Sequence, residues 1–346
     1  LKLPAFAVSP FFFVRGMSCR RVAVLSAQLC ASLETQPTSS LERIAGDSKW
    51  NSEASTLGSG GSLKGKTVFI TGASRGIGLA IARRAAKDGA NIVICAKTKE
   101  DHKTLPGTIY SAAKEVEALG GRALPCVVDV REEASIKAAV EQAVEVFGGI
   151  DILVNCASAI FPVPTEKIDI KRLDLMWEIT TRAPLLTAKH CIPHLKKSAA
   201  AGRNPHILTC SPPVDFQYIP LPDNPNYMVC KMGMSVGTLA LAHELRFAGV
   251  GANTLWPATA IATSAVNHLA GNNPKVLDDM YSRARTPEIQ ADAAYAIFTS
   301  DSRKFTGNMT IDEDVVVRAG VADLSIYDYA SLGKTMEERL ARIIRL

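Results

Sequence analysis

The chain has 346 residues, of which 47% are hydrophobic and 21% charged, and its net charge is +5. This composition is sufficient for a full hydrophobic core, and the length fits one large domain or two small ones. The charge is mild and no Lys/Arg block recurs, which argues against a nucleic-acid partner.

The eight cysteines stand singly, without a CxxC pair, and are interpreted as reduced core thiols. His190 and His194 lie four apart, but no Glu completes a zinc motif, so no metal site is expected.

Residues 1–62 differ in composition from the rest of the chain. Residues 1–33 contain one Lys, three Arg and no acidic residue, with frequent Ser and Ala. This composition is typical of a mitochondrial transit peptide; an extension without a targeting role is the alternative. The apolar run at 11–14 is far too short to span a bilayer, so no membrane span is expected. Residues 57–62 are Leu, Gly and Ser, which indicates a flexible linker and places the start of the folded domain near Leu63.

From Leu63 onward, short β-branched runs alternate with amphipathic stretches. Strands are expected at 67–71, 91–96, 123–128, 151–155, 206–210, 252–256 and 309–311. Helices are expected at 77–87, 109–119, 134–147, 172–196, 227–247 and 291–298. The strands are continuous apolar runs, as in a sheet covered on both faces. The pattern predicts an α/β fold: a Rossmann-like doubly wound parallel sheet in one domain, 63–320, followed by a tail, 321–346, with a short helix at 334–344.

A glycine-rich segment lies where the first strand meets the first helix. Glycines permit a tight turn and a close approach of the backbone to a pyrophosphate, and the helix N-terminus faces the phosphates. The segment therefore predicts a dinucleotide site. Its expected cofactor-binding residues are Gly72, Ser74, Arg75, Gly76, Ile77 and Gly78.

The end of the second strand bears on the choice between NAD and NADP. An acid there would bind the ribose 2′-hydroxyl, but this chain has Lys97 instead, and Arg75 stands in the glycine segment. Two cations without an opposing acid favour NADP(H), with NAD(H) as a second possibility; merely solvated cations are the alternative. Asp129, at the end of the third strand, is expected to accept a hydrogen bond from the adenine amine. Further expected cofactor contacts at the same edge of the sheet are Val130, Asn155 and Ala157.

Tyr227 and Lys231 lie one helical turn apart, after a strand that ends in Ser211. The positive charge of Lys231 would stabilise a phenolate on Tyr227. Tyr227 could then give a proton to a carbonyl or take one from an alcohol. The Ser211 hydroxyl could hydrogen-bond the same substrate oxygen. Taken alone, a Tyr and a Lys at this spacing are a common coincidence, so the interpretation depends on the nucleotide fold around them.

Together, the TGxxxGxG segment at 71–78, the NxA segment at 155–157, Ser211 and the YxxxK pair resemble the short-chain dehydrogenase/reductase family. The resemblance covers roughly 63–311. It implies that Ser211, Tyr227 and Lys231 are the catalytic trio and that Lys231 also holds the nicotinamide ribose. Further segments resemble a subgroup, the hydroxysteroid-dehydrogenase-like proteins. Members of that subgroup are associated with mitochondria and peroxisomes and often carry a C-terminal sterol-carrier domain.

The chain departs from the family pattern at several positions. A catalytic Asn of the family, which steadies a proton-relay water, corresponds to Thr180, so slow turnover is expected. The usual Asn-Asn-Ala-Gly becomes Asn-Cys-Ala-Ser, which puts Ser158 near the nicotinamide. The turn after the sixth strand is Pro257-Ala258, which leaves Pro257, Thr259 and Thr263 as expected cofactor contacts.

The sequence thus predicts an NADP-preferring oxidoreductase acting on an alcohol or carbonyl group of a small-molecule substrate. A lid at about 260–287 is expected to be irregular and mobile. Its apolar residues favour a lipid-like substrate, although ordinary helix packing explains them equally well. The rival interpretation is a catalytically weak scaffold or a redox-sensing protein, and a lipid-handling module is a third.

Homo-oligomers are expected to pair through the helices around 184–196 and 227–247. The expected location is mitochondrial, with peroxisomal as the alternative.

Overall fold

The computed structural model describes residues 57–58, 61–100, 106–214, 224–270 and 273–332, which belong to one compact unit, 53–346. The predicted transit peptide and the predicted helix at 334–344 lie outside the described residues.

A seven-stranded parallel sheet forms the centre of the described structure, with the order β3-β2-β1-β4-β5-β6-β7. β1 is entirely buried and pairs with β2 on one side and β4 on the other. The strands are β1 (Thr67–Thr71), β2 (Asn91–Ala96), β3 (Arg122–Val127), β4 (Ile152–Asn155), β5 (His206–Thr209), β6 (Gly251–Trp256) and β7 (Met309–Ile311). The predicted doubly wound α/β fold is confirmed, and each predicted strand is present within one residue at either end.

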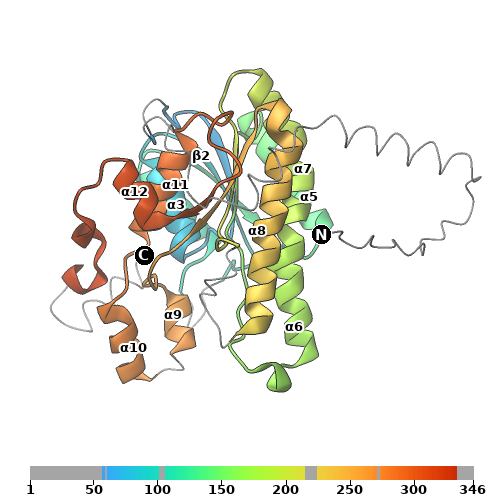
Figure 1. Ribbon diagram of the computed structural model, residues 1–346. Coiled ribbons are helices and arrows are strands. Elements are labelled where there is room, and N and C mark those ends of the chain that lie inside the picture. Colours follow the sequence, from blue (N-terminus) through green and yellow to red (C-terminus); the bar gives the residue numbers. More distant parts are fainter. Residues whose placement is uncertain (1–56, 59–60, 101–105, 215–223, 271–272, 333–346) are drawn as a thin grey trace, which may run out of the picture. The chain divides into compact units, whose positions relative to one another are not determined.

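Helices cover both faces of this sheet (Figure 1). One face carries α3 (Gly76–Ala86), α4 (Ile109–Ala118) and α11 (Glu288–Phe298), and α12 (Asp312–Arg318) packs on α11. The other face carries α5 (Glu133–Phe147), α7 (Ala183–Ala200) and α8 (Pro225–Leu245). Beneath these three helices lies a continuous apolar core that includes Phe69, Leu153 and Leu195, each fully buried.

The structure corrects the sequence prediction at three helical segments. The helix expected at 172–196 consists of α6 (Ile170–Met176), a π-helical turn η2 (Trp177–Arg182) and α7. The expected irregular lid contains α9 (Ser264–Leu269) and α10 (Pro274–Ser282), and Asn273 caps α10 by accepting a hydrogen bond from the Lys275 N–H at 3.1 Å. The helix α12 has no counterpart in the prediction. Beyond it, the chain continues through two short turns, Leu324–Tyr327 and Tyr329–Leu332, in which Tyr327 and Tyr329 are buried.

Asp151, just before β4, anchors the amino edge of the sheet. Its carboxylate accepts hydrogen bonds from the Thr67 N–H at 2.8 Å, the Ser198 hydroxyl at 2.6 Å and Arg203 Nε at 2.7 Å. Burial would raise the pKa of Asp151, but the hydrogen bonds from Arg203, Ser198 and Thr67 outweigh it and lower this pKa. This cluster ties β1 and β4 to the end of α7.

Candidate active site

The glycine segment connects the carboxyl end of β1 to the first turn of α3. Gly72 and Gly76 have φ values of 74° and 57°, in the region that favours glycine. A Cβ on Gly78 would lie 2.4 Å from the Gly72 carbonyl oxygen, and one on Gly72 would lie 2.9 Å from the Ala157 nitrogen. The segment therefore packs backbone against backbone directly before the N-terminus of α3, and helix N-termini are suited to bind phosphate groups.

Thr71 joins this loop to the end of β4. Its hydroxyl donates to the Val154 carbonyl at 3.3 Å and accepts from the N–H groups of Cys156 at 3.2 Å and Ala157 at 3.3 Å. The predicted cofactor residues Gly72 and Ala157 are thereby held together. Ser74 and Ile77 lie in the same turn, and Ser74 is buried.

Arg75 is directed toward the connection between β2 and α4. Its Nη2 donates to the Gly107 carbonyl at 2.8 Å, and its Nε is buried without a hydrogen-bond partner among the described residues. Burial lowers the pKa of the guanidinium. Arg75 thus retains an unused donor near the predicted ribose end of the cofactor.

Lys97 and Asp129, expected to act separately, form an ion pair of 3.0 Å between Lys97 Nζ and Asp129 Oδ2. Arg131, which the sequence interpretation missed, binds the same carboxylate through Nη2 at 2.6 Å and Nε at 3.0 Å. Hydrogen bonds from Arg131, and then Lys97, hold the pKa of Asp129 well below its usual range. The carboxylate is saturated by these two cations, so an adenine amine would have to compete with them. Val130, the next residue, is buried.

The three predicted catalytic residues converge at the end of β5. Lys231 Nζ donates to the Cys210 carbonyl at 2.8 Å, and the Ser235 hydroxyl donates to the Pro212 carbonyl at 2.5 Å. These two bonds from α8 lie on either side of Ser211. Lys231 Nζ is also 5.8 Å from the centroid of the Tyr227 ring. Helix α8 therefore positions Tyr227 and Lys231 against the strand end that carries Ser211.

Ser211 is fully buried, and within the described part of the chain its hydroxyl has no hydrogen-bond partner. The side-chain nitrogen of Asn155 is in the same condition, while its oxygen accepts a 2.6 Å hydrogen bond from the Thr187 hydroxyl. Unpaired buried polar atoms are unfavourable and usually have an explanation. Both of these lie at the carboxyl edge of the sheet, where ligands bind in open α/β folds.

Thr180, which is expected from the sequence to take the position of the family's Asn, lies in the π-helical turn η2 and is fully buried. Its hydroxyl accepts a hydrogen bond from the Ala159 N–H at 3.4 Å. The adjacent Thr181 donates to the Cys230 carbonyl of α8 at 3.1 Å. The π turn thus connects the loop after β4 to the helix of Tyr227, and π turns occur frequently at functional sites.

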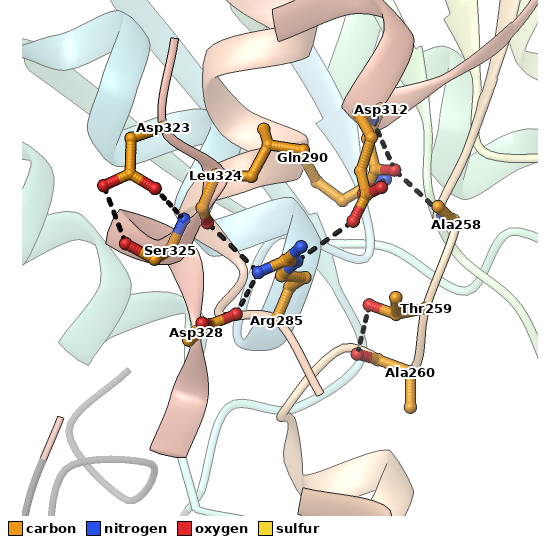
Figure 2. Close-up of polar contacts among 11 residues, drawn as sticks. Ala258, Thr259, Ala260, Arg285, Gln290, Asp312, Asp323, Leu324, Ser325 and Asp328 are labelled. Carbon is orange, nitrogen blue, oxygen red and sulfur yellow. Dashed lines mark hydrogen bonds and ion pairs between the residues drawn. The ribbon is translucent and has the colours of Figure 1, made fainter. Parts of the chain in front are cut away.

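Asp312, which the sequence interpretation also missed, holds the loop after β6 in place. Figure 2 shows its carboxylate between the Ala258 N–H and Gln290, with both hydrogen bonds 2.8 Å long. Burial raises the pKa of this fully buried carboxyl group. Asp312 therefore fixes the turn between Pro257 and Thr259, the predicted cofactor contacts of this loop. An acidic residue at the start of a helix was its only signal in the sequence.

The surroundings of Tyr227 are apolar. Met176, Tyr227, Met228 and Cys230 form a buried cluster. Partly buried side chains that pack against this cluster are Ala159, Ile160, Phe161, Ile168, Leu173, Met232 and Trp256. The reacting end of the site is thus lined by carbon and sulfur more than by polar groups.

The residues present fit a dinucleotide: two glycines leave no room for a Cβ, a helix begins beside them, and Arg75 Nε, the Asn155 side-chain nitrogen and the Ser211 hydroxyl have no hydrogen-bond partner within the described ranges. Among the described residues, no group of three or more His, Cys, Asp or Glu is placed to hold a metal ion. No helix in the described ranges combines the length and apolar character that crossing a membrane requires.

Comparison with known proteins agrees with this geometry. Residues 66–273 match the family model described as short chain dehydrogenase, and the chain belongs to this family. Hydroxysteroid dehydrogenase-like protein 2 of Danio rerio is 52% identical over 267 residues, which cover 77% of this chain and 61% of that protein. The human protein of the same name is 51% identical with the same coverage. The chain therefore spans about three fifths of the length of these curated relatives.

Solved structures show the same fold. A structure from Xanthomonas campestris, 48% identical, covers 77% of this chain and 94% of its own with a TM-score of 0.71. A short chain dehydrogenase from Mycobacterium thermoresistibile is 49% identical, with a TM-score of 0.69 and coverage of 77% and 91%. Carveol dehydrogenase from Mycobacterium avium, solved in complex with NAD, is 25% identical over 72% of this chain and 97% of that one, with a TM-score of 0.61.

Proposed function

We propose that this oxidoreductase prefers NADP(H) and transfers a hydride between the nicotinamide and an alcohol or carbonyl carbon of a hydrophobic substrate. The observation that carries the proposal is the buried Ser211 hydroxyl, which has no hydrogen-bond partner among the described residues and is flanked by the hydrogen bonds of Lys231 and Ser235. A hydroxyl in that condition suits a substrate oxygen.

In this mechanism, a bound nicotinamide supplies or accepts the hydride. The Ser211 hydroxyl donates a hydrogen bond to the substrate oxygen, and the Tyr227 phenol gives that oxygen a proton or removes one. The ammonium of Lys231 is held by the Cys210 carbonyl and lies beside Tyr227, with Nζ 5.8 Å from the centroid of the Tyr227 ring. The apolar cluster around Tyr227 excludes water, which strengthens each of these interactions.

The preference for NADP(H) is supported by the charges near the ends of β2 and β3. Lys97 and Arg131 share the single carboxylate of Asp129, so one positive charge remains for a 2′-phosphate, and Arg75 adds another. NAD(H) is the second candidate, because the relative from Mycobacterium avium was solved with NAD.

A fluorescence titration with NADPH and NADH tests this preference. We expect Lys97→Asp to weaken NADPH binding selectively, because the change removes one charge and adds the opposite one. Lys99→Asp is the matched control, since Lys99 carries the same charge two residues away and is exposed. Equal weakening of NADH and NADPH binding would contradict the preference, and no binding of either nucleotide would overturn the proposed function.

The apolar surroundings of Tyr227 support a hydrophobic substrate, and the name of the vertebrate relatives refers to hydroxysteroids. The expected apolar lid offers weaker support. Ala262 and Val266 pack with Tyr281, Ala284 and Tyr329 in a small core of their own, as ordinary helix packing would require. A screen of apolar against charged carbonyl compounds, with Tyr227→Phe as the blank, tests the substrate class.

The alternative is a nucleotide-binding protein with weak turnover, in a scaffold or redox-sensing role. Thr180 favours it, because this residue takes the position of the water-holding Asn and its hydroxyl already accepts the Ala159 N–H. If slow turnover has this cause, Thr180→Asn should raise kcat. A kcat unchanged by the substitution would remove the main support for this alternative.

We also propose a homo-oligomer formed through α7 and α8. Leu185, Val229 and Val236 on these helices are 48%, 60% and 55% exposed, which is high for large apolar side chains. Light scattering on the wild type and on Val236→Asp tests this interface. A wild-type mass equal to one chain would contradict it.

The mitochondrial location remains a proposal that depends on the Arg-bearing, acid-free composition of residues 1–33. A fusion of residues 1–57 to a fluorescent reporter tests it. Diffuse cytosolic signal would contradict it, and peroxisomal signal of the full chain would favour the alternative.

A further inference from the structure

Two cross-strand cysteine pairs occupy different environments in the sheet. Cys95 on β2 is the register partner of Cys126 on β3, and both are buried in the apolar core. Cys156 and Cys210 directly follow the register pair Asn155–Thr209 of β4 and β5. The Cys210 N–H donates to the Asn155 carbonyl at 3.0 Å, so the parallel ladder continues to this second pair.

The second pair lies at the cofactor end of the sheet. Cys210 is the residue whose carbonyl binds Lys231 Nζ, and Cys156 is the residue whose N–H binds the Thr71 hydroxyl beside Gly72. Cys156 is partly exposed, whereas Cys95, Cys126 and Cys210 are buried. Of these four residues, Cys156 is therefore the one with part of its surface exposed.

We propose that Cys156 and Cys210 form an oxidisable dithiol, with Cys156 as the thiol that reacts with hydroperoxides and Cys210 as the thiol that resolves the product. Neighbouring strands lie roughly 4.8 Å apart. This separation is inside the range of about 4.4–6.8 Å that the Cα atoms of a disulfide span. The strand pairing therefore permits the bond with little movement of the backbone.

The groups around Cys156 favour its thiolate, which is the form that attacks a hydroperoxide. The pKa of Cys156 is lowered, although burial acts in the opposite direction. The causes are the interaction with the Cys210 thiol, the charge of Lys231 and the Gly78 N–H. Interaction with the Cys156 thiol and burial raise the pKa of Cys210, against the charge of Lys231. In the other pair the interaction with Cys95 also lowers the pKa of Cys126, but Lys231 is not among the groups that act on it. The core pair is thus a matched reference without the cation or the exposure.

The chemistry balances with one hydroperoxide for each disulfide. The Cys156 thiolate sulfur attacks the peroxide, the O–O bond breaks, and the products are a sulfenic acid and, after protonation, an alcohol or water. The sulfur of Cys210 then attacks the sulfenic sulfur, and the displaced hydroxide leaves as water with the Cys210 proton. The two sulfurs lose two electrons in total, and the hydroperoxide gains them.

Oxidation should weaken nucleotide binding. A disulfide would draw the Cys156 sulfur away from the Gly78 N–H, and the Cys156 backbone is hydrogen-bonded to Thr71 beside Gly72. A shift there would move the loop that holds the phosphates. This readout rests on the proposed function, whereas the cysteine chemistry does not.

The test treats the full chain with hydrogen peroxide and maps thiols by mass spectrometry after alkylation and trypsin digestion. Cys156 lies in peptide 138–167, while Cys210 shares peptide 204–231 with Cys230, so fragment ions must assign the bond. We expect a Cys156–Cys210 disulfide while Cys95 and Cys126 remain thiols. NADPH binding should fall by more than half and return with dithiothreitol.

Two variants sharpen the result. In Cys210→Ser, Cys156 should proceed to the sulfinic acid, and dithiothreitol should no longer restore binding. In Cys156→Ser, peroxide should leave binding at the level of the untreated variant. The proposal is overturned if Cys156 stays reduced, if Cys126 oxidises as fast, or if peroxide weakens binding equally in Cys156→Ser. If the reduced chain binds no nucleotide, the proposed function fails, but the mapped disulfide still decides the cysteine proposal.

Discussion

Asp151 at the amino edge of the sheet and Ser211 at the carboxyl edge differ in how their buried polar groups are satisfied. At the amino edge, the Asp151 carboxylate receives hydrogen bonds from the Thr67 backbone and the side chains of Ser198 and Arg203. At the carboxyl edge, the Ser211 hydroxyl and the Asn155 side-chain nitrogen have no partner in the described part of the chain. The first arrangement serves stability. The second leaves polar atoms that can hydrogen-bond a ligand. Substitutions at the amino edge should therefore lower the unfolding free energy, whereas substitutions at the carboxyl edge should lower activity.

The largest effect is expected for Tyr227→Phe, which removes the proposed proton donor at the carboxyl edge. The rate of carbonyl reduction should fall by about 100- to 10,000-fold. Nucleotide affinity should change little, because the glycine loop is untouched. Steady-state kinetics and an NADPH titration measure the two quantities, and unchanged turnover would contradict the assignment of Tyr227.

Two serines compare the edges directly. Ser211→Ala should lower kcat/KM by about 100- to 1,000-fold, with no loss of unfolding free energy because the hydroxyl has no partner among the described residues. Ser198→Ala should do the reverse: it removes the 2.6 Å hydrogen bond to Asp151 and lowers the unfolding free energy by about 1 kcal/mol. Denaturant unfolding and kinetics on both variants check this, and a large stability loss in Ser211→Ala would remove the contrast.

A third comparison uses two glycines. Gly78→Ala forces a Cβ to 2.4 Å from the Gly72 carbonyl oxygen. Strain of this kind typically lowers the unfolding free energy by roughly 1–3 kcal/mol, and here it should also displace the nucleotide loop. Gly149→Ala is the control, since no described atom lies within 4 Å of the new Cβ and the residue has no positive φ. Thermal unfolding and NADPH titration should distinguish the two variants.

The smallest effect concerns pH. The pKa of Asp151 is lower in the folded chain than in the unfolded one, so its stabilisation is complete above the unfolded value of about 3.9. It is lost as the pH falls through the folded value. Asp151→Asn should lower the unfolding free energy at pH 7 by about 1 kcal/mol, a modest figure because the Arg203 side chain is 45% exposed. The difference in unfolding free energy between this variant and the wild type should shrink below about pH 4. A difference that does not change with pH would contradict a stabilising role of the ionised Asp151 carboxylate.

Local patterns predicted the sheet well. β1 and β2 contain the apolar runs 68–70 and 92–96, almost all of whose residues are buried, and both strands have the expected bounds. Short helices were harder to predict. In α12 three consecutive valines favour a strand, and only the acids of its first turn indicate a helix N-terminus. In α10 the signals were present, since Asn273 and Pro274 form an N-cap and first turn.

The prediction of a catalytic trio follows from motif spacing, because Tyr227 and Lys231 share a helix face and Ser211 is the second residue after a strand. Contacts between distant segments could not be predicted in the same way. The ion pairs of Asp129 with Lys97 and Arg131 depend on β2 and β3 ending side by side. The hydrogen bond from the Ala258 N–H to Asp312 spans 54 residues. Such contacts are set by the packing of the whole sheet.

The most direct test of the central claim is the unfolding free energy of the wild type with and without NADPH. If the carboxyl edge is a nucleotide site, NADPH at one hundred times its dissociation constant should stabilise the folded chain by about 2.7 kcal/mol. Gly78→Ala should abolish the gain and Asp151→Asn should retain it. A wild-type stability that does not respond to NADPH or NADH would contradict the claim that the carboxyl edge of the sheet, with Ser211 and Asn155, is a dinucleotide site.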